Sequence, residues 1–211
     1  MKLLYSYHDS LGAVGCTITV DEAYGLARPA ANDPRGNRPW IGMCMVSGID
    51  GSTVVDGSSQ ALSGPADREV LLALRRSADT VLVGAGTVRD EGYGSPSKAG
   101  QRIAVASRSG RVDLSTPLFV SGAGLIVSPR DGDMFSMVEA LPGSFVQLEG
   151  GAKLNASMVD HDLVDEINLT VSPNVTGGSG PRLTDGATNL LLRFDLQHVL
   201  EDDGFLFLRY I

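Results

Sequence analysis

A pair of glycines follows a short apolar run in the first half of the chain. The run 80–83 is typical of a buried strand, and it leads directly into Gly84-Ala85-Gly86-Thr87. Gly84 and Gly86 would let the backbone approach a pyrophosphate while free amide groups face the anion. Arg89 stands where the dinucleotide fingerprint has its third glycine, so a simple tight turn between strand and helix is the alternative.

A carboxylate and a second glycine pair follow another apolar run, 145–148. Glu149 precedes Gly150-Gly151, and open α/β sheets bind their ligands at the carboxyl ends of such strands. Glu149 could accept hydrogen bonds from ribose hydroxyls or ring N–H groups, while the helix that follows could meet a phosphate at its N-terminus. A surface glutamate before a glycine-rich turn is the alternative.

A local excess of basic residues interrupts an acidic background. Between Lys98 and Arg111 there are four basic residues and no acidic one. Ser107 and Arg108 end the apolar run 103–106, so a hydroxyl and a guanidinium could hold the 2′-phosphate that distinguishes NADP from NAD. A solvated loop is the alternative for such a charge cluster.

The other reactive side chains do not form a recognisable group. Asp50-Gly51 follows the apolar run 40–47, where Asp50 could orient a substrate or a loop, although Asp-Gly is usually a turn. The three histidines and two cysteines lack metal-ligand spacing, so we expect no metal site: His8, His161, His198, Cys16 and Cys44. The zinc deaminase signature and the G-x-S-x-G motif of serine hydrolases are also missing.

The elements that must position these residues alternate between strand and helix, which indicates an α/β protein with a mainly parallel sheet. Pro65 begins a helix that ends near Ala78, and residues 153–159 form a shorter one. Residues 48–64 are predicted to be a polar loop outside the core. Strands are expected at 40–47, 80–83, 103–106, 125–127, 145–148 and 164–171.

The two ends of the chain differ from this pattern. Residues 190–199 and 205–210 alternate apolar with polar residues around Glu201-Asp202-Asp203-Gly204, which predicts an antiparallel hairpin. Residues 1–37 contain clustered turn residues, including Arg28-Pro29 and Asp33-Pro34. We therefore expect an N-terminal arm over 1–37 and a single domain over 38–211.

Composition limits the partners. The chain has 211 residues and a formal net charge of −8, which disfavours binding to nucleic acid or to an anionic membrane surface. Two cysteines cannot build a disulfide framework, and the sequence has neither a secretory signal nor a long apolar span. These features predict a cytoplasmic protein.

Taken in order, several short motifs resemble the pyrimidine reductase family, the C-terminal reductase domain of the bifunctional deaminase-reductases of riboflavin biosynthesis. The resemblance extends from about Arg38 to the C-terminus. It rests on Asp50-Gly51, Asp56-Gly57-Ser58-Ser59, Ser63-Gly64-Pro65-Ala66-Asp67-Arg68, Leu74-Arg75, Ala78-Asp79, Val83 to Arg89, Glu149-Gly150-Gly151 and Leu163-Val164-Asp165-Glu166.

The resemblance implies a dihydrofolate reductase-like α/β fold, with helices flanking a mainly parallel sheet and an antiparallel C-terminal hairpin. It also implies NADPH as cofactor and a homodimer. The implied reaction reduces 5-amino-6-(5-phosphoribosylamino)uracil, a phosphorylated heterocycle, to its ribitylamino product. The implied cofactor-binding residues are Val46, Ala61, Thr87, Glu91, Ser107, Gly151, Ala152, Lys153, Leu154 and Asn155, which join Gly84, Gly86, Arg108 and Gly150.

Ser59, Arg75 and Glu149 fall on substrate-binding positions of the family. Arg75 would meet the substrate phosphate. Glu149 is the main catalytic candidate, because it would fix the acceptor with the proton coming from it or from water. Asp50 matches the family's Leu-Asp-Gly turn and joins the catalytic candidates in a positional role only.

The sequence departs from the family pattern in four places. Cys44 replaces a substrate-side lysine, Gly48 a serine and Ala61 a tryptophan, while Glu91-Gly92-Tyr93 replaces Asp-Asp-Pro. The last of these resembles a stand-alone actinobacterial branch, which keeps reduction of a pteridine such as dihydrofolate open. A dinucleotide-binding protein without reductase activity is a further alternative. A sugar or nucleotide transferase would need an activated acid or a metal site, and neither is evident.

Overall fold

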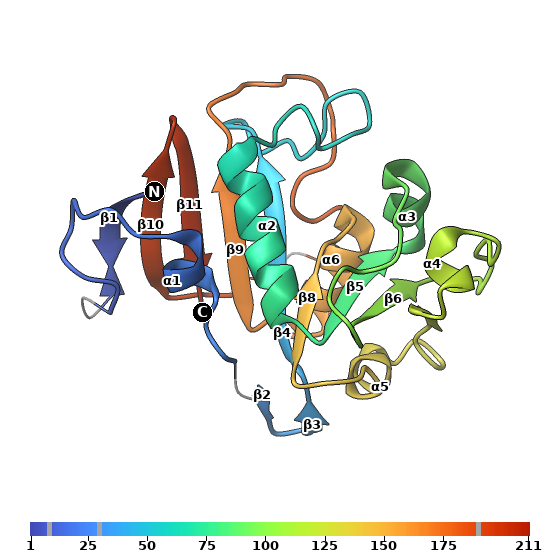
Figure 1. Ribbon diagram of the computed structural model, residues 1–211. Helices are drawn as coiled ribbons and strands as arrows, with labels where there is room; N and C mark the ends of the chain where they lie inside the picture. Colours follow the sequence, from blue (N-terminus) through green and yellow to red (C-terminus); the bar gives the residue numbers. More distant parts are fainter. Residues whose placement is uncertain (8–9, 29–30, 189–190) are drawn as a thin grey trace.

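The computed structural model describes residues 1–7, 10–28, 31–188 and 191–211, and a nine-stranded mixed sheet runs through the molecule (Figure 1). The strand order is β1-β10-β11-β9-β4-β8-β5-β6-β7. A separate two-stranded hairpin joins β2 (Ala31–Asp33) and β3 (Gly36–Arg38). No helix among the described residues is long and apolar enough to cross a membrane.

Six strands form the parallel part of the sheet, and the sequence predicts all six. They are β9 (Glu166–Val171), β4 (Trp40–Ser47), β8 (Phe145–Leu148), β5 (Thr80–Gly84), β6 (Arg102–Ala106) and β7 (Gly124–Val127). Their apolar residues are mostly buried because helices cover both faces. Since the strands are parallel, their carboxyl ends lie along one edge of the sheet, where every predicted glycine turn is found.

The antiparallel part consists of β11 (Phe205–Tyr210), β10 (Leu196–Asp202) and the edge strand β1 (Lys2–Ser6). The hairpin turn has Asp203 and Gly204 at positive φ, as a two-residue turn of this type requires. The predicted hairpin is confirmed, but its first strand begins at Leu196, not at residue 190. Residues 191–195 are irregular, and residues 189–190 lie outside the described residues.

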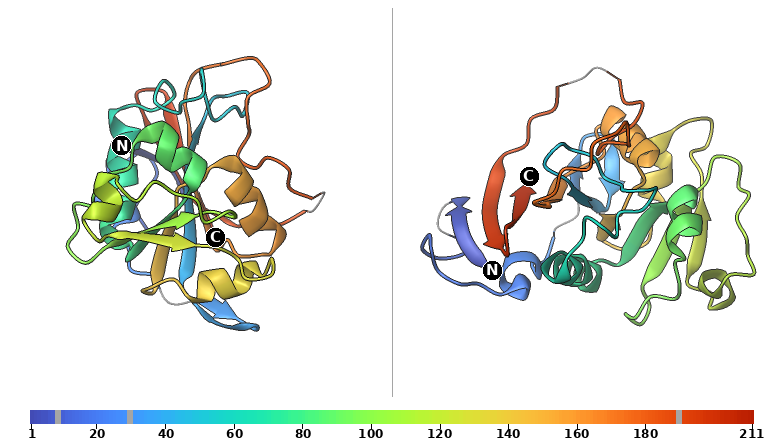
Figure 2. Two further views of the ribbon diagram at one scale, coloured as in Figure 1. Left: turned by 90° about the vertical axis from the view of Figure 1, so that its right-hand side faces the viewer. Right: turned by 90° about the horizontal axis from the view of Figure 1, so that it is seen from above.

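The helices divide between the two faces of the sheet (Figure 2). On one face lie α1 (Val20–Tyr24), α2 (Pro65–Ser77), α3 (Ala85–Glu91) and α4 (Pro117–Val120), and on the other lie α5 (Met134–Glu139) and α6 (Ala152–Asp160). Both predicted helices are therefore present. The loop 48–64 is also present, but the expectation that it stays outside the core is wrong for Leu62, which is buried.

The first 37 residues are packed on the rest of the chain. β1 pairs with β10, and Leu3, Ala23 and Tyr24 are fully buried with α2 in one core cluster. The division of the chain into an arm and a reductase domain stays a prediction. Physically, the arm contributes to the same core.

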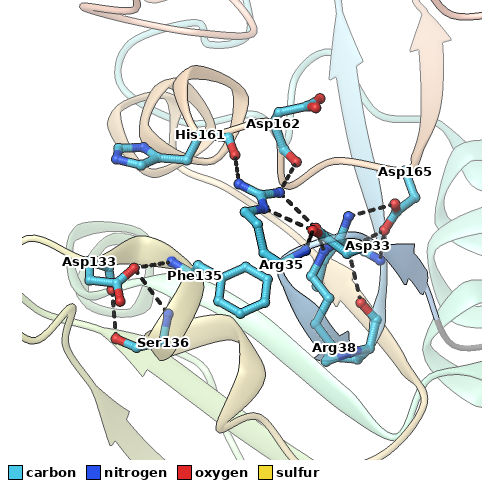
Figure 3. Close-up of polar contacts among 11 residues, drawn as sticks. Asp33, Arg35, Arg38, Asp133, Phe135, Ser136, His161, Asp162 and Asp165 are labelled. Atoms are coloured by element: carbon cyan, nitrogen blue, oxygen red, sulfur yellow. Dashed lines mark hydrogen bonds and ion pairs between the residues drawn. The ribbon is translucent and has the colours of Figure 1, made fainter.

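The β2–β3 hairpin is fixed at the amino ends of the parallel strands, opposite the glycine turns. Arg38 forms a bidentate ion pair with Asp165, and Arg35 and Arg38 both bind Asp33 (Figure 3). Arg35 also donates to the carbonyl oxygens of His161 and Asp162. The Asp165 of the family motif is thus a structural anchor, remote from the site.

Candidate functional site

The two predicted glycine turns are in direct contact. The N–H of Gly84, at the end of β5, donates to the carbonyl oxygen of Gly150, after the neighbouring strand β8, at 2.6 Å. A Cβ on Gly151 would lie 3.0 Å from Oγ1 of Thr87, and Gly150 has φ of 85°. Side chains at these positions would crowd the junction, so the turns present bare backbone to whatever lies above them.

A cavity of about 380 Å³ opens above this junction. It lies at the carboxyl ends of the parallel strands, the position where open α/β sheets bind ligands. Its wall includes most of the charged and polar residues that the resemblance assigns to the site. Ser59, Arg75, Glu149, Val46, Thr87, Glu91, Gly151 and Ala152 line it, together with Cys44, Asp67, Asp90 and Tyr93.

Glu149 and Arg75 are paired with each other across the cavity wall. Nε and Nη2 of Arg75 each donate to a different carboxylate oxygen of Glu149, both at 2.6 Å. The Glu149 side chain is only 4% exposed, so it would be unstable there without such a partner. Burial opposes the charge of Arg75, but the hydrogen bonds and attraction from Glu149 raise the pKa of its guanidinium.

Tyr93 completes this cluster. Its hydroxyl donates to Oε2 of Glu149 at 2.5 Å, and Cζ of Arg75 lies 5.4 Å from the centre of its ring. Burial, followed by the negative charge of Glu149, raises the pKa of the Tyr93 phenol. The phenol therefore stays protonated and remains a hydrogen-bond donor to the carboxylate.

Cys44, on β4, lies on the same side of the sheet. Burial, followed by the charges of Asp67 and Glu149, raises the pKa of the Cys44 thiol well above its usual value. The thiol is thus neutral and a poor nucleophile. The cavity is lined by more acidic than basic side chains. Among the described residues, its acidic residues are Asp67, Asp90, Glu91 and Glu149, and its one basic residue is Arg75.

Two loops complete the cavity. The hydroxyl of Ser59 donates to Oε1 of Glu91, which ties the loop 48–64 to the end of α3. The backbone N–H and the hydroxyl of Thr53 both donate to the carbonyl oxygen of Pro181, each at 3.0 Å. Residues far apart in the chain are thereby held over the glycine turns.

Several predicted site residues lie elsewhere. Asp50 accepts hydrogen bonds from the backbone N–H groups of Gly177 and Thr176, which lower the pKa of its carboxyl, and it orders a loop outside the cavity. Asn155 is fully buried, and its amide donates to the carbonyl oxygen of Leu183. Leu154 packs on the core, whereas Ala61 and Lys153 are exposed and do not line the cavity.

Ser107 and Arg108 follow β6, next to the first glycine turn. Gly84 and Ala106 are register partners in β5 and β6, so Ser107 begins beside that turn. Ser107 is buried, and Arg108 is exposed. This arrangement would allow the two side chains to reach an extra phosphate on a dinucleotide that lies across the turns.

A second cavity, of about 470 Å³, adjoins the first. The residues that line both cavities are Arg75, Tyr93, Ser59, Ser63, Leu71 and Glu91.

The contact of Tyr93 with Glu149 is not predicted from the sequence, since the two residues are 56 positions apart. The available signal was the replacement of Asp-Asp-Pro by Glu-Gly-Tyr.

Comparison with known proteins identifies relatives over most of the chain. The model of the RibD C-terminal domain family matches residues 39–206. The 2,5-diamino-6-ribosylamino-4(3H)-pyrimidinone 5′-phosphate reductase of Methanothermobacter thermautotrophicus is 27% identical over 183 residues, which cover 71% of this chain and 85% of that protein.

Solved structures agree with this match. A pyrimidine reductase-like protein from Corynebacterium diphtheriae superposes with a TM-score of 0.68 at 20% identity, covering 82% of this chain and 91% of that one. The riboflavin biosynthesis reductase Rib7 of Saccharomyces cerevisiae has a TM-score of 0.62 at 18% identity, covering 82% and 89% of the two chains.

The RibD protein of Acinetobacter baumannii has a TM-score of 0.67 at 22% identity, and this chain covers 58% of its length. The predicted dihydrofolate reductase-like fold and the resemblance to the reductase domain are both confirmed. The chain belongs to the RibD C-terminal domain family of pyrimidine reductases.

Proposed function

We propose that the protein is an NADPH-dependent reductase that converts 5-amino-6-(5-phosphoribosylamino)uracil into the ribitylamino product during riboflavin biosynthesis. The observation that carries the proposal is the contact between the two glycine turns beneath a cavity walled by Glu149 and Arg75. A reductase of this kind needs a place for a dinucleotide next to a place for a polar heterocycle, and this junction offers both.

The fold requires glycine at both positions, because a side chain at Gly151 would crowd Thr87 and one at Gly150 would lie 3.2 Å from the sulfur of Met45. The turns therefore leave backbone uncovered beside the cavity, where a pyrophosphate could approach it. Gly84, Gly86, Gly150 and Gly151 would hold the pyrophosphate, with the N-terminus of α6 facing it. Ser107 and Arg108 would hold the 2′-phosphate, which favours NADPH over NADH. When bound, NADPH supplies the hydride.

The protein's own residues would bind and orient the acceptor. Glu149 would accept hydrogen bonds from the acceptor's N–H or hydroxyl groups and hold the reacting carbon in line with the donor. Arg75 uses two of its five N–H donors on Glu149, which leaves others for the substrate phosphate. Loops 48–64 and 172–188 would exclude water from above, since Thr53 and Pro181 join them beside the cavity.

A pteridine such as dihydrofolate is the second candidate acceptor. The neutral thiol of Cys44 stands where the family has a lysine, and the cavity carries more acidic than basic side chains. Both features suit a neutral heterocycle with amino groups better than a phosphorylated one.

The deciding experiment follows NADPH oxidation with the aminouracil phosphate and, separately, with dihydrofolate. Turnover of the aminouracil phosphate supports the first proposal, and turnover of dihydrofolate alone supports the second. NADPH binding without turnover of either would mean a dinucleotide-binding protein that lacks reductase activity. Absence of NADPH binding in titration calorimetry would refute all of these.

We further propose a cytoplasmic homodimer. The antiparallel part of the sheet, with β1 at its edge, exposes apolar side chains on β1, on β11 and at the C-terminus. They are Leu4, Tyr5, Leu206 and Ile211, between 36% and 40% exposed. A second copy could cover them. Cys16 and Cys44 are both free thiols, which suits a reducing compartment.

A further inference from the structure

Tyr93 stands at a junction of three parts of the site. Its ring lines both cavities, its hydroxyl binds Glu149, and its ring face lies beside Arg75. No expectation from the family assigns it a role, because the family pattern has a proline at this position.

The helix α3 fixes Tyr93 relative to the first glycine turn, which follows β5. α3 begins with the turn residues at Ala85 and ends at Glu91, and Gly92 then adopts a left-handed conformation with φ of 67°. The N–H of Gly92 donates to the carbonyl oxygen of Val88 and closes the helix. The turn at Gly84 is therefore joined to Tyr93 by the seven-residue helix α3 and its C-cap residue Gly92.

The hydrogen bonds at Glu149 are shared in a defined way. Among the described residues, Oε1 accepts from Arg75 alone, whereas Oε2 accepts from both Arg75 and Tyr93. The guanidinium pair fixes the plane of the carboxylate, and the phenol restrains the oxygen that lies toward α3. Without the phenol, Glu149 could follow Arg75 when a substrate phosphate draws that arginine away.

We propose that Tyr93 is a positioning residue that acts through Glu149. It holds the carboxylate in place while Arg75 also engages the acceptor through its remaining N–H groups. The proposal rests on the proposed reductase function and adds a specific determinant to it. It assigns Tyr93 no part in binding the dinucleotide.

The test is a double-mutant cycle of Tyr93→Phe and Glu149→Gln. Phenylalanine keeps the ring beside Arg75 and removes only the hydroxyl. We expect Tyr93→Phe to lower kcat about tenfold while the Kd for NADPH changes by less than about twofold. In the Glu149→Gln background the same change should lower kcat by less than about threefold, because the charged acceptor is already gone. Tyr210→Phe, on β11, is the matched control.

Each outcome decides the matter. An unchanged kcat in Tyr93→Phe, an equal loss in both backgrounds, or a parallel loss of NADPH binding would each overturn the positioning role while leaving the reductase proposal standing. A wild-type protein that oxidises no NADPH with either acceptor would instead overturn the reductase proposal, and the positioning role with it.

Discussion

At the scale of single residues, Glu149 is the group on which the proposed chemistry depends. It is nearly fully buried, yet three hydrogen bonds from Arg75 and Tyr93 satisfy its charge. A buried carboxylate held so closely loses little entropy when a substrate binds to it, which is what orientation of an acceptor requires.

Glu149→Gln preserves the shape of this side chain and removes its charge. We expect kcat to fall on the order of 100-fold while the Kd for NADPH changes by less than about threefold, because in the proposed binding mode the dinucleotide would lie over the glycine turns and not over the carboxylate. Steady-state NADPH oxidation and fluorescence titration measure the two quantities. Glu69→Gln, exposed on α2, is the control. Equal losses of turnover and affinity would contradict the assignment.

Arg108 tests cofactor choice. Arg108→Ala should weaken NADPH binding about tenfold or more and leave NADH binding unchanged, since a charge-assisted hydrogen bond to the 2′-phosphate contributes about 1.5–3 kcal/mol. Arg111→Ala removes another exposed cation from the same basic stretch and should have little effect. Competitive titration of both dinucleotides measures the ratio, and a similar loss in the two variants would mean that only general charge matters.

The sequence indicated many of the residues around the cavity, because each matched motif assigns particular residues of this chain to the family's site. Ser59, Arg75 and Glu149 line one cavity as expected. It could not show that Arg75 and Glu149 pair with each other, since that contact depends on how α2 lies over β8. Asp50 lies outside the cavity, where its Asp-Gly turn orders a loop by hydrogen bonds to residues 176–177, and its catalytic candidacy stays a prediction.

At the scale of elements, buried apolar runs were the strongest signal. Most strands of the parallel sheet are covered on both faces, so their sequences are distinct from the flanking loops. The alternating pattern before β10 wrongly placed the start of this strand at residue 190 and not at Leu196, because apolar residues there are buried by packing outside the sheet. Phe194 packs on the core without its segment pairing in a sheet, so apolar spacing there reports packing alone.

The turn before β8 provides a test of an element's geometry. Gly143 has φ of 95°, and a Cβ there would lie 2.1 Å from Cβ of Asp79, whose carboxylate binds the backbone N–H groups of Ser144 and Phe145. Gly143→Ala should lower the free energy of unfolding on the order of 3 kcal/mol, by strain and by displacement of Asp79.

Gly132→Ala separates the two causes. Gly132 has φ of 83° but nothing within 4 Å of a built Cβ, so only backbone strain, about 1 kcal/mol, should appear. Urea denaturation measures both variants. If they lose equal stability, the crowding against Asp79 has no consequence.

At the scale of the whole molecule, a buried ionic cluster joins parts that are distant in sequence. Glu166, at the start of β9, binds Arg28 from the N-terminal segment and Arg209 from β11. Burial raises the pKa of Glu166, but the two arginines outweigh it and lower that pKa to about 2. Glu166 of the family motif is therefore, like Asp165, an anchor of the fold.

His198 on β10 lies close to this cluster, packed edge to face on Tyr24. Burial, followed by the charge of Arg209 and, to a smaller degree, of Arg28, outweighs the attraction of Glu166 and lowers its pKa from 6.5 to about 4. The folded protein keeps this histidine neutral, and its Nε2 finds no hydrogen-bond partner in the part of the chain that the structure describes. Below pH 6.5 the unfolded chain binds a proton that the folded protein does not.

The free energy of unfolding should consequently fall between pH 6.5 and pH 4, by on the order of 3 kcal/mol from His198, and this part of the loss should level off below pH 4. His198→Phe removes the titrating group and keeps a ring against Tyr24, so its stability should be flatter over the same range. Urea denaturation of both proteins at pH 7, 5 and 4 measures the difference. If the two proteins show the same pH dependence, acid destabilises the fold at other groups. The buried junction of sheet, hairpin and N-terminal segment around His198 would then not be the acid-sensitive part of the fold.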